Sequence, residues 1–187
     1  MTMHKAFPVA IGMAGFLAMA GSMAMFRLHE PGSSMRGVHP IWLERKWPFP
    51  LDQWGIGKAF VCLPTDCGDQ VSLYLRPKIG FCNCATGVDD DAELERVGDN
   101  ELISATSRAM GFGHAVRVGW MKGRGRLYQE SKNADSYLLS IAFNDRCDAI
   151  AALATLGHGN PEIVEPAVIA FLNSDPILRW AGKALGS

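Results

Sequence analysis

The sequence lacks an excess of charge of either sign. Its 187 residues include 18 basic and 19 acidic side chains, which leaves a formal net charge of −1. A protein that binds nucleic acid or anionic lipid through its overall field needs a basic surface, and this composition provides no such field. We therefore expect no nucleic acid among the partners of this chain.

The sequence also lacks the short motifs that mark many catalytic and phosphate-binding sites. It contains no G-x-G-x-x-G or G-x-x-x-x-G-K-[ST] loop, no G-x-S-x-G elbow and no H-E-x-x-H pair. The acidic run Asp89 to Asp91 with Glu93 lacks the glycine and the distal glutamate of an EF-hand loop. We expect no catalytic residue and no cofactor, and we favour a role other than catalysis.

A long uncharged stretch does occur, from Ala6 to Phe26, after the weakly basic start His4-Lys5. As a helix rising about 1.5 Å per residue it would measure about 30 Å, the thickness of the hydrocarbon core of a bilayer. Because the stretch is longer than the apolar region of most signal peptides, we favour an uncleaved signal anchor or transmembrane helix over residues 1–27. Small residues near Ala20 and Ala24 leave cleavage by signal peptidase as the alternative.

The charges and the cysteines disagree about the side of the membrane that the rest of the chain faces. Arg27, Arg36, Arg45 and Lys46 outnumber Lys5, which by the positive-inside rule would keep them in the cytoplasm. The density of cysteine and the leader-like amino terminus favour export. We choose export and expect a single-pass inner-membrane protein whose domain faces the periplasm, or a released protein if the leader is cleaved.

Three alanines within the uncharged stretch, Ala10, Ala14 and Ala18, are spaced four residues apart. On a helix they form a smooth ridge on which another transmembrane helix could pack closely. Alanine is also common in exported leaders, which would leave the ridge without a role. We treat the three alanines as candidate partner-binding residues.

Residues 28–54 read as a tether, because glycine, serine and several prolines suit an extended chain. Trp42, Trp47, Phe49 and Trp54 are costly to leave in water. We expect this stretch to pack on the folded domain. The alternative is that it lies at the membrane surface or binds a partner, with Trp42 and Trp47 as the candidate contacts.

Residues 55–187 combine strand and helix patterns. Strands are predicted over Gly57–Leu63, Gln70–Arg76 and Lys78–Cys84 as a meander with a tight turn around Pro77, over His114–Met121 and Arg126–Glu130 as a hairpin across KGRG, and over Ser136–Phe143. Helices are predicted over Asp89–Val97, from Asn144 to Leu156, and in two segments after Gly159 that divide near Asp175 and Pro176. The pattern favours an exported α+β domain, an antiparallel sheet packed by C-terminal helices.

Four of the five cysteines lie between Cys62 and Cys84. In a strand, Cys82 and Cys84 face the same side with α carbons about 6.6 Å apart, near the outer limit for a bond to each other. We predict two structural disulfides that join Cys62 and Cys67 to Cys82 and Cys84, each worth about 3 kcal/mol, with the pairing left open. A short Cys62 to Cys67 bridge that leaves Cys82 and Cys84 as free thiols is also possible.

Two other readings of the cysteines remain. Same-face thiolates on Cys82 and Cys84 could hold a soft ion such as Cu(I) or act as a redox pair, although neither pair has the C-x-x-C form of redox motifs. Cys147, predicted in the first turn of a helix, reads as a small buried hydrophobe. A nucleophilic Cys147 would need His114 or His158 nearby.

Arg124 and Arg126, together with Arg117 and Lys122, make the predicted hairpin tip basic and free of acids. Such a tip could touch lipid headgroups or an acidic partner, or it could be an ordinary soluble turn. The sequence as a whole predicts a membrane-anchored, exported accessory or binding protein that works with a membrane or envelope complex. The alternative is a copper-handling or thiol-redox factor that uses Cys82 and Cys84.

Overall fold

The computed structural model describes residues 40–131 and 135–186, and these form an α+β fold. The eight strands are β1 (Trp42–Arg45), β2 (Lys58–Cys62), β3 (Val71–Lys78), β4 (Ser107–Ala109), β5 (His114–Val118), β6 (Met121–Glu130), β7 (Tyr137–Asp145) and β8 (Asp148–Gly157). The helices are α1 (Pro64–Cys67), α2 (Asp91–Val97), the short 3-10 helix η1 (Asn100–Leu102), α3 (Pro161–Leu172) and α4 (Asp175–Leu185). The predicted transmembrane segment lies outside the described residues, and none of the helices in the described part is long and apolar enough to cross a membrane.

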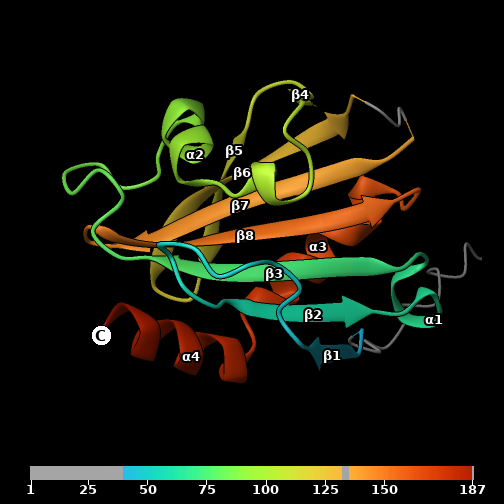
Figure 1. The fold of residues 1–187 in the computed structure, drawn as a ribbon, viewed down its shortest axis with the longest axis horizontal. Helices are drawn as coiled ribbons and strands as arrows, with labels where there is room; N and C mark the ends of the chain where they lie inside the picture. Colours follow the sequence, from blue (N-terminus) through green and yellow to red (C-terminus); the bar gives the residue numbers. More distant parts are fainter. Residues whose placement is uncertain (1–39, 132–134, 187) are drawn as a thin grey trace, which may run out of the picture. The chain divides into compact units, whose positions relative to one another are not determined.

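All strands pair antiparallel in one sheet of order β1-β2-β3-β8-β7-β6-β4, with β5 also paired to β6. The chain builds one edge with β1 to β3, crosses to the far edge, and returns inward through β6, β7 and β8 (Figure 1). The first and last parts of the domain therefore meet in the middle, where Leu73 of β3 pairs with Ala154 of β8.

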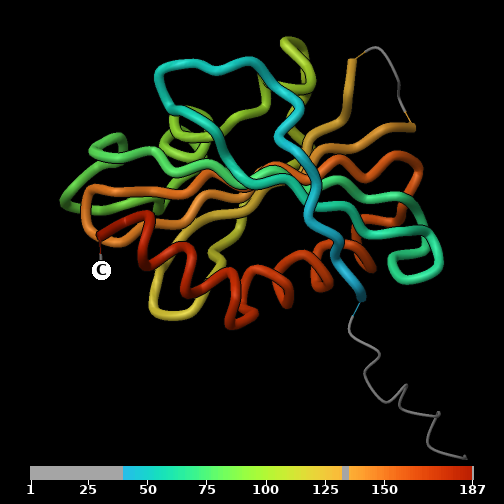
Figure 2. Tube along the Cα trace, turned by 60° about the horizontal axis from the view of Figure 1, so that its bottom comes forward, coloured from blue at the N-terminus to red at the C-terminus, as the bar shows by residue number. Residues whose placement is uncertain are grey.

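The sheet is covered on both faces (Figure 2). Helices α3 and α4 lie on one face, where Val164, Val168 and Ile177 join the main core with Leu73 and Phe143. Helix α2 and the segment 46–57 lie on the other face. Because side chains alternate along a strand, residues of β3 and β6 that point away from α3 and α4 project toward α2 and this segment.

The predicted helix from Asn144 to Leu156 is wrong: after a short turn at Arg146, the chain forms the central strand β8. Arg146 has a φ of 56°, which lets the chain reverse directly between β7 and β8. A central strand with both faces covered reads as a continuous apolar run, and alanine fits the space between packed layers. Residues 148–157 are rich in alanine, which has a high helix propensity, and they do not alternate between apolar and polar, so the sequence favours a helix where the structure has a strand.

Two other predicted elements are also wrong. Strand β3 continues through Pro77 to Lys78, so no third meander strand runs over Lys78–Cys84. Pro77 is tolerated because β2 pairs with β3 only as far as Leu75. The KGRG sequence lies inside β6, and the turn of the hairpin is at Gly119, whose φ is 58°.

Helix α2 and the division of the C-terminal helices follow the predictions. Asp90 accepts a hydrogen bond from the backbone N–H of Glu93 and so caps α2. The C-terminal segment divides at Ser174 into α3 and α4. Residues 42–45, which the sequence predicts as part of a tether, instead form β1 and pair with β2.

Candidate functional site

Two disulfides staple the domain, but not in the predicted pairing. Cys62 bonds Cys67, with α carbons 6.0 Å apart, and Cys84 bonds Cys147 across 63 residues. The cross-pairing of Cys62 and Cys67 with Cys82 and Cys84 is therefore wrong, and the short bridge considered as an alternative is present. Cys147 is not the buried hydrophobe of a helix that the sequence predicts: it lies in the turn between β7 and β8, and its sulfur bonds to Cys84.

Cys82 keeps a free thiol that is 6% exposed. Its Sγ lies 3.3 Å from the carbonyl oxygen of Arg146. Burial, with smaller contributions from Glu93 and Asp148, raises the pKa of Cys82 to about 11. Because Cys84 is bonded to Cys147, the two residues do not form a pair of thiolates, and the described part of the chain holds no cluster of three or more metal-ligating side chains.

The nucleophilic reading of Cys147 fails for the same reason, since its sulfur is bonded to Cys84. His114 is at the start of β5, and its Nε2 is 2.7 Å from a carboxylate oxygen of Glu165 on α3. The backbone N–H of His158 donates to Asp69 in the turn after β8.

The candidate partner-binding tryptophans pack on the domain. Trp42 stacks on Phe171 of α3 with ring centroids 4.8 Å apart. Trp47 meets Phe49 and Tyr74 edge to face, at 5.2 and 6.2 Å. These contacts confirm the expectation that the aromatic stretch packs on the folded domain. Ala10, Ala14 and Ala18 lie outside the described residues.

Arg124 and Arg126 do not form an open hairpin tip. Both lie in β6, on the face toward α2, and they are 20% and 15% exposed. Arg124 pairs with Asp91 at the start of α2, and Arg126 contacts Glu95 at 2.8 Å. The hydrogen bond from Arg124 is the main reason that the pKa of Asp91 is lowered. The two arginines thus attach α2 to the sheet.

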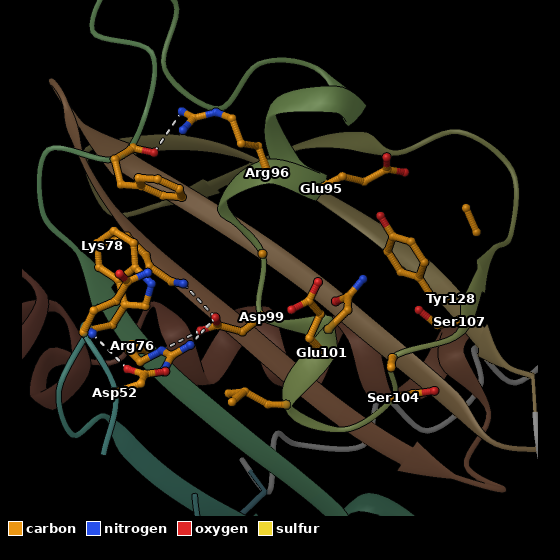
Figure 3. A pocket seen from close by; sticks show the side chains of 18 residues that line it. Asp52, Arg76, Lys78, Glu95, Arg96, Asp99, Glu101, Ser104, Ser107 and Tyr128 are labelled. Atoms are coloured by element: carbon orange, nitrogen blue, oxygen red, sulfur yellow. Dashed lines mark hydrogen bonds and ion pairs between the residues drawn. The ribbon is translucent and has the colours of Figure 1, made fainter. Parts of the chain in front are cut away.

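A hollow of about 940 Å³ lies on this same face, between the sheet, α2 and the segment that carries Trp54 (Figure 3). We call it the polar hollow. Its lining comprises Asp52, Gln53, Trp54, Arg76, Lys78, Phe81, Glu95, Arg96, Gly98, Asp99, Asn100, Glu101, Leu102, Ser104, Ala105, Ser107, Ala109 and Tyr128.

Two buried cations share one buried carboxylate at one end of the polar hollow (Figure 3). Arg76 donates from Nε and Nη2 to the two oxygens of Asp99, at 3.0 and 2.5 Å, and from Nη1 to Asp52 at 2.5 Å. Lys78 Nζ lies 2.8 Å from Asp99. Arg76, Lys78 and Asp99 are only 3%, 4% and 7% exposed, whereas the Asp52 side chain is 42% exposed.

The pKa directions follow from these contacts. Burial alone would lower the pKa of Arg76, but hydrogen bonding and attraction from Asp99 and then Asp52 outweigh it and raise the pKa. The pKa of Asp52 is lowered, first by the backbone N–H of Trp54 and then by Arg76. The pKa shifts of both Arg76 and Asp52 therefore favour the charged form of each group.

Aromatic rings form the wall beside the charges. Lys78 Nζ lies 4.5 Å from the ring centroid of Trp54, close enough for a cation–π contact. Trp54 also packs on Phe81 with centroids 4.6 Å apart, and the guanidinium of Arg96 covers the same Phe81 ring at 4.6 Å. These contacts hold the segment around Trp54 against the sheet.

Two buried polar side-chain atoms of the lining have no hydrogen-bond partner of ordinary geometry. The Tyr128 hydroxyl and the Asn100 Oδ1 are buried and make no hydrogen bond. Burial raises the pKa of Tyr128, and Glu95 adds to the effect. Arg126 opposes it through its charge and as a nearby donor to the hydroxyl, with its guanidinium 5.6 Å from the ring centroid, although the geometry falls short of an ordinary hydrogen bond. A buried hydroxyl left without a partner costs free energy unless something binds it.

These residues were not singled out from the sequence, although one signal was present. Arg76 and Lys78 are charged, lie two positions apart and share one face of a strand whose other face is apolar. Asp99 is 23 residues from Arg76, so only the fold brings them together.

This chain matches no protein-family model, no curated protein and no solved structure in the comparisons made with known proteins. A role for the polar hollow therefore rests on its own chemistry.

Proposed function

We propose that this chain is a membrane-anchored, exported protein that acts as an accessory or binding subunit of an envelope complex, with the polar hollow as its binding surface. The observation that carries the proposal is the pair of disulfides, since such bonds persist in oxidising compartments and are rare in the cytosol. The length of the uncharged stretch Ala6 to Phe26 supports an anchor.

The polar hollow supports a binding role. Its volume falls within the range of about 300 to 1,000 Å³ typical of ligand sites, and its charged side chains are held in place by ion pairs. A site whose polar groups are already oriented loses little entropy when it binds.

The test is extraction of the tagged full-length chain from its native membrane in mild detergent, followed by identification of what copurifies. We expect a membrane or envelope protein in a fixed ratio to this chain. Recovery of a lone monomer at native expression levels would count heavily against the proposal.

A variant with leucine at Ala10, Ala14 and Ala18 separates two ways of binding that partner. It keeps the stretch apolar but removes the small-residue ridge. Loss of the partner places the contact in the anchor, and retention of the partner places it on the domain.

A further inference from the structure

The cations that line the polar hollow are already paired. Arg76 and Lys78 share Asp99, and Arg96 binds Glu93 at 2.6 Å. An anionic ligand at this end would be repelled by Asp99, which already neutralises Arg76 and Lys78. The hollow is therefore poorly suited to an anionic ligand.

What the hollow leaves unused is hydrogen-bond acceptors. Glu101, exposed at the rim, makes no ion pair with any residue that the structure describes. Glu95 contacts Arg126 through Oε1. The Asn100 Oδ1 accepts no hydrogen bond, and the hydroxyl of Tyr128, a residue only 4% exposed, makes none of ordinary geometry, although the Arg126 guanidinium lies over its ring. Figure 3 shows Glu95, Glu101 and Tyr128 on the side of the hollow away from Asp52 and Arg76.

Of the four carboxylates in the lining, Asp52, Asp99 and Glu95 are held by cations, so the carboxylate of Glu101 is the one of the four left without an ion pair to any described residue. A carboxylate, an amide oxygen and a hydroxyl are acceptors for a group that carries several N–H donors. We propose that the polar hollow binds a guanidinium or primary ammonium group, carried either by a free amine or by a basic side chain of a partner. The proposal rests on the proposed function only in taking this hollow as the binding surface.

The test measures binding to the full-length chain in mild detergent by isothermal titration calorimetry. Three probes are used: agmatine as a free guanidine, the blocked tripeptide acetyl-Gly-Arg-Gly-amide, and the same tripeptide with citrulline, which keeps the shape of arginine without its charge. We expect saturable binding of both guanidinium probes and at least about tenfold weaker binding of the citrulline peptide, because charge-assisted hydrogen bonds are the stronger kind.

The two guanidinium probes distinguish the source of the group. Tighter binding of the tripeptide assigns it to a partner's side chain, and tighter binding of agmatine assigns it to a free compound. Equal binding of the citrulline peptide, or no saturable binding of either guanidinium probe, overturns the proposal.

Two variants locate the binding within the hollow. E101Q should weaken the guanidinium probes about tenfold, and Y128F, which removes only the unpartnered hydroxyl, about threefold. The matched control E162Q removes a carboxylate from α3, on the opposite face of the sheet, and should leave the affinity unchanged. Thermal melting checks that each variant is folded, and unchanged affinity in both E101Q and Y128F refutes the assignment.

Failure of this inference and failure of the proposed function give different results. If the probes bind as described but no envelope protein copurifies, the accessory role is wrong and the site remains. If an envelope protein copurifies equally with wild type and E101Q while no probe binds, the accessory role survives and the inference about this hollow does not.

Discussion

Replacement of Asp99 by asparagine is the sharpest test of the charged end of the polar hollow. The substitution keeps the shape of the side chain but removes the carboxylate that Arg76 and Lys78 share. Both cations are at least nine-tenths buried, so they cannot recover their lost partner from water. Asp52 still binds Arg76 from the rim.

The expected cost is large because the loss of one partner leaves buried charge uncompensated. Breaking a buried ion pair in this way costs about 3 to 5 kcal/mol. For a chain of this size each kcal/mol lowers the melting temperature by about 2 to 4 °C, so D99N should melt about 10 °C lower than wild type. The control D52N removes a carboxylate that is 42% exposed and should cost about 1 kcal/mol or less.

The measurement is thermal unfolding of the full-length protein in mild detergent, followed by circular dichroism at fixed protein concentration. The prediction is a large shift for D99N and a small one for D52N. Equal, small shifts for both variants would show that Asp99 does not hold the two buried cations as described.

Three further predictions test other parts of the structure. At pH 8 the Cys82 thiol should alkylate about a hundredfold more slowly in the native than in the unfolded protein, because its pKa rises from 9.0 to about 11. Mass spectrometry after timed iodoacetamide treatment measures this rate, and rapid labelling of the native protein would contradict the prediction. The pKa of Asp91 is lowered, chiefly by the hydrogen bond from Arg124, so Asp91 stabilises the fold above its ordinary pKa of 3.8 and this stabilisation is lost as pH falls through the native pKa. D91N should flatten that part of an acid-unfolding curve. An unchanged curve would count against the contact. G123A should destabilise the protein by about 3 kcal/mol, since a Cβ there would lie 2.1 Å from a carbonyl oxygen of β7. The control G80A is at a positive φ with open space around it and should cost about 1 kcal/mol. Equal costs for the two variants in chemical denaturation would refute the crowding at Gly123.

The parts of the fold that could be predicted are those with a local cause. The capping aspartate of α2 and the division between α3 and α4 depend on neighbours in sequence. Strand β8 could not be recognised, because its burial comes from β3, β7 and both covering layers rather than from its own pattern.

The cysteine pairing shows the same limit. The bond between Cys62 and Cys67 is local and was among the alternatives, whereas the bond between Cys84 and Cys147 depends on where the β7–β8 turn lies in the fold. The predicted helix from Asn144 to Leu156 gives no reason to place Cys147 near Cys84, whereas the turn into β8 brings the two together. The polar hollow was missed for a related reason, since Asp99 and Tyr128 come from segments that only the sheet topology brings to Arg76.

The most direct test of an exported, disulfide-stapled and membrane-anchored protein is the intact mass of the full-length chain from its native membrane. The protein is unfolded in the presence of a thiol-blocking reagent, with and without prior reduction. The account predicts one blocked thiol without reductant and five with it, on a chain that retains residues 1–27. Five blocked thiols without reductant would contradict the disulfides and, with them, the inference of export.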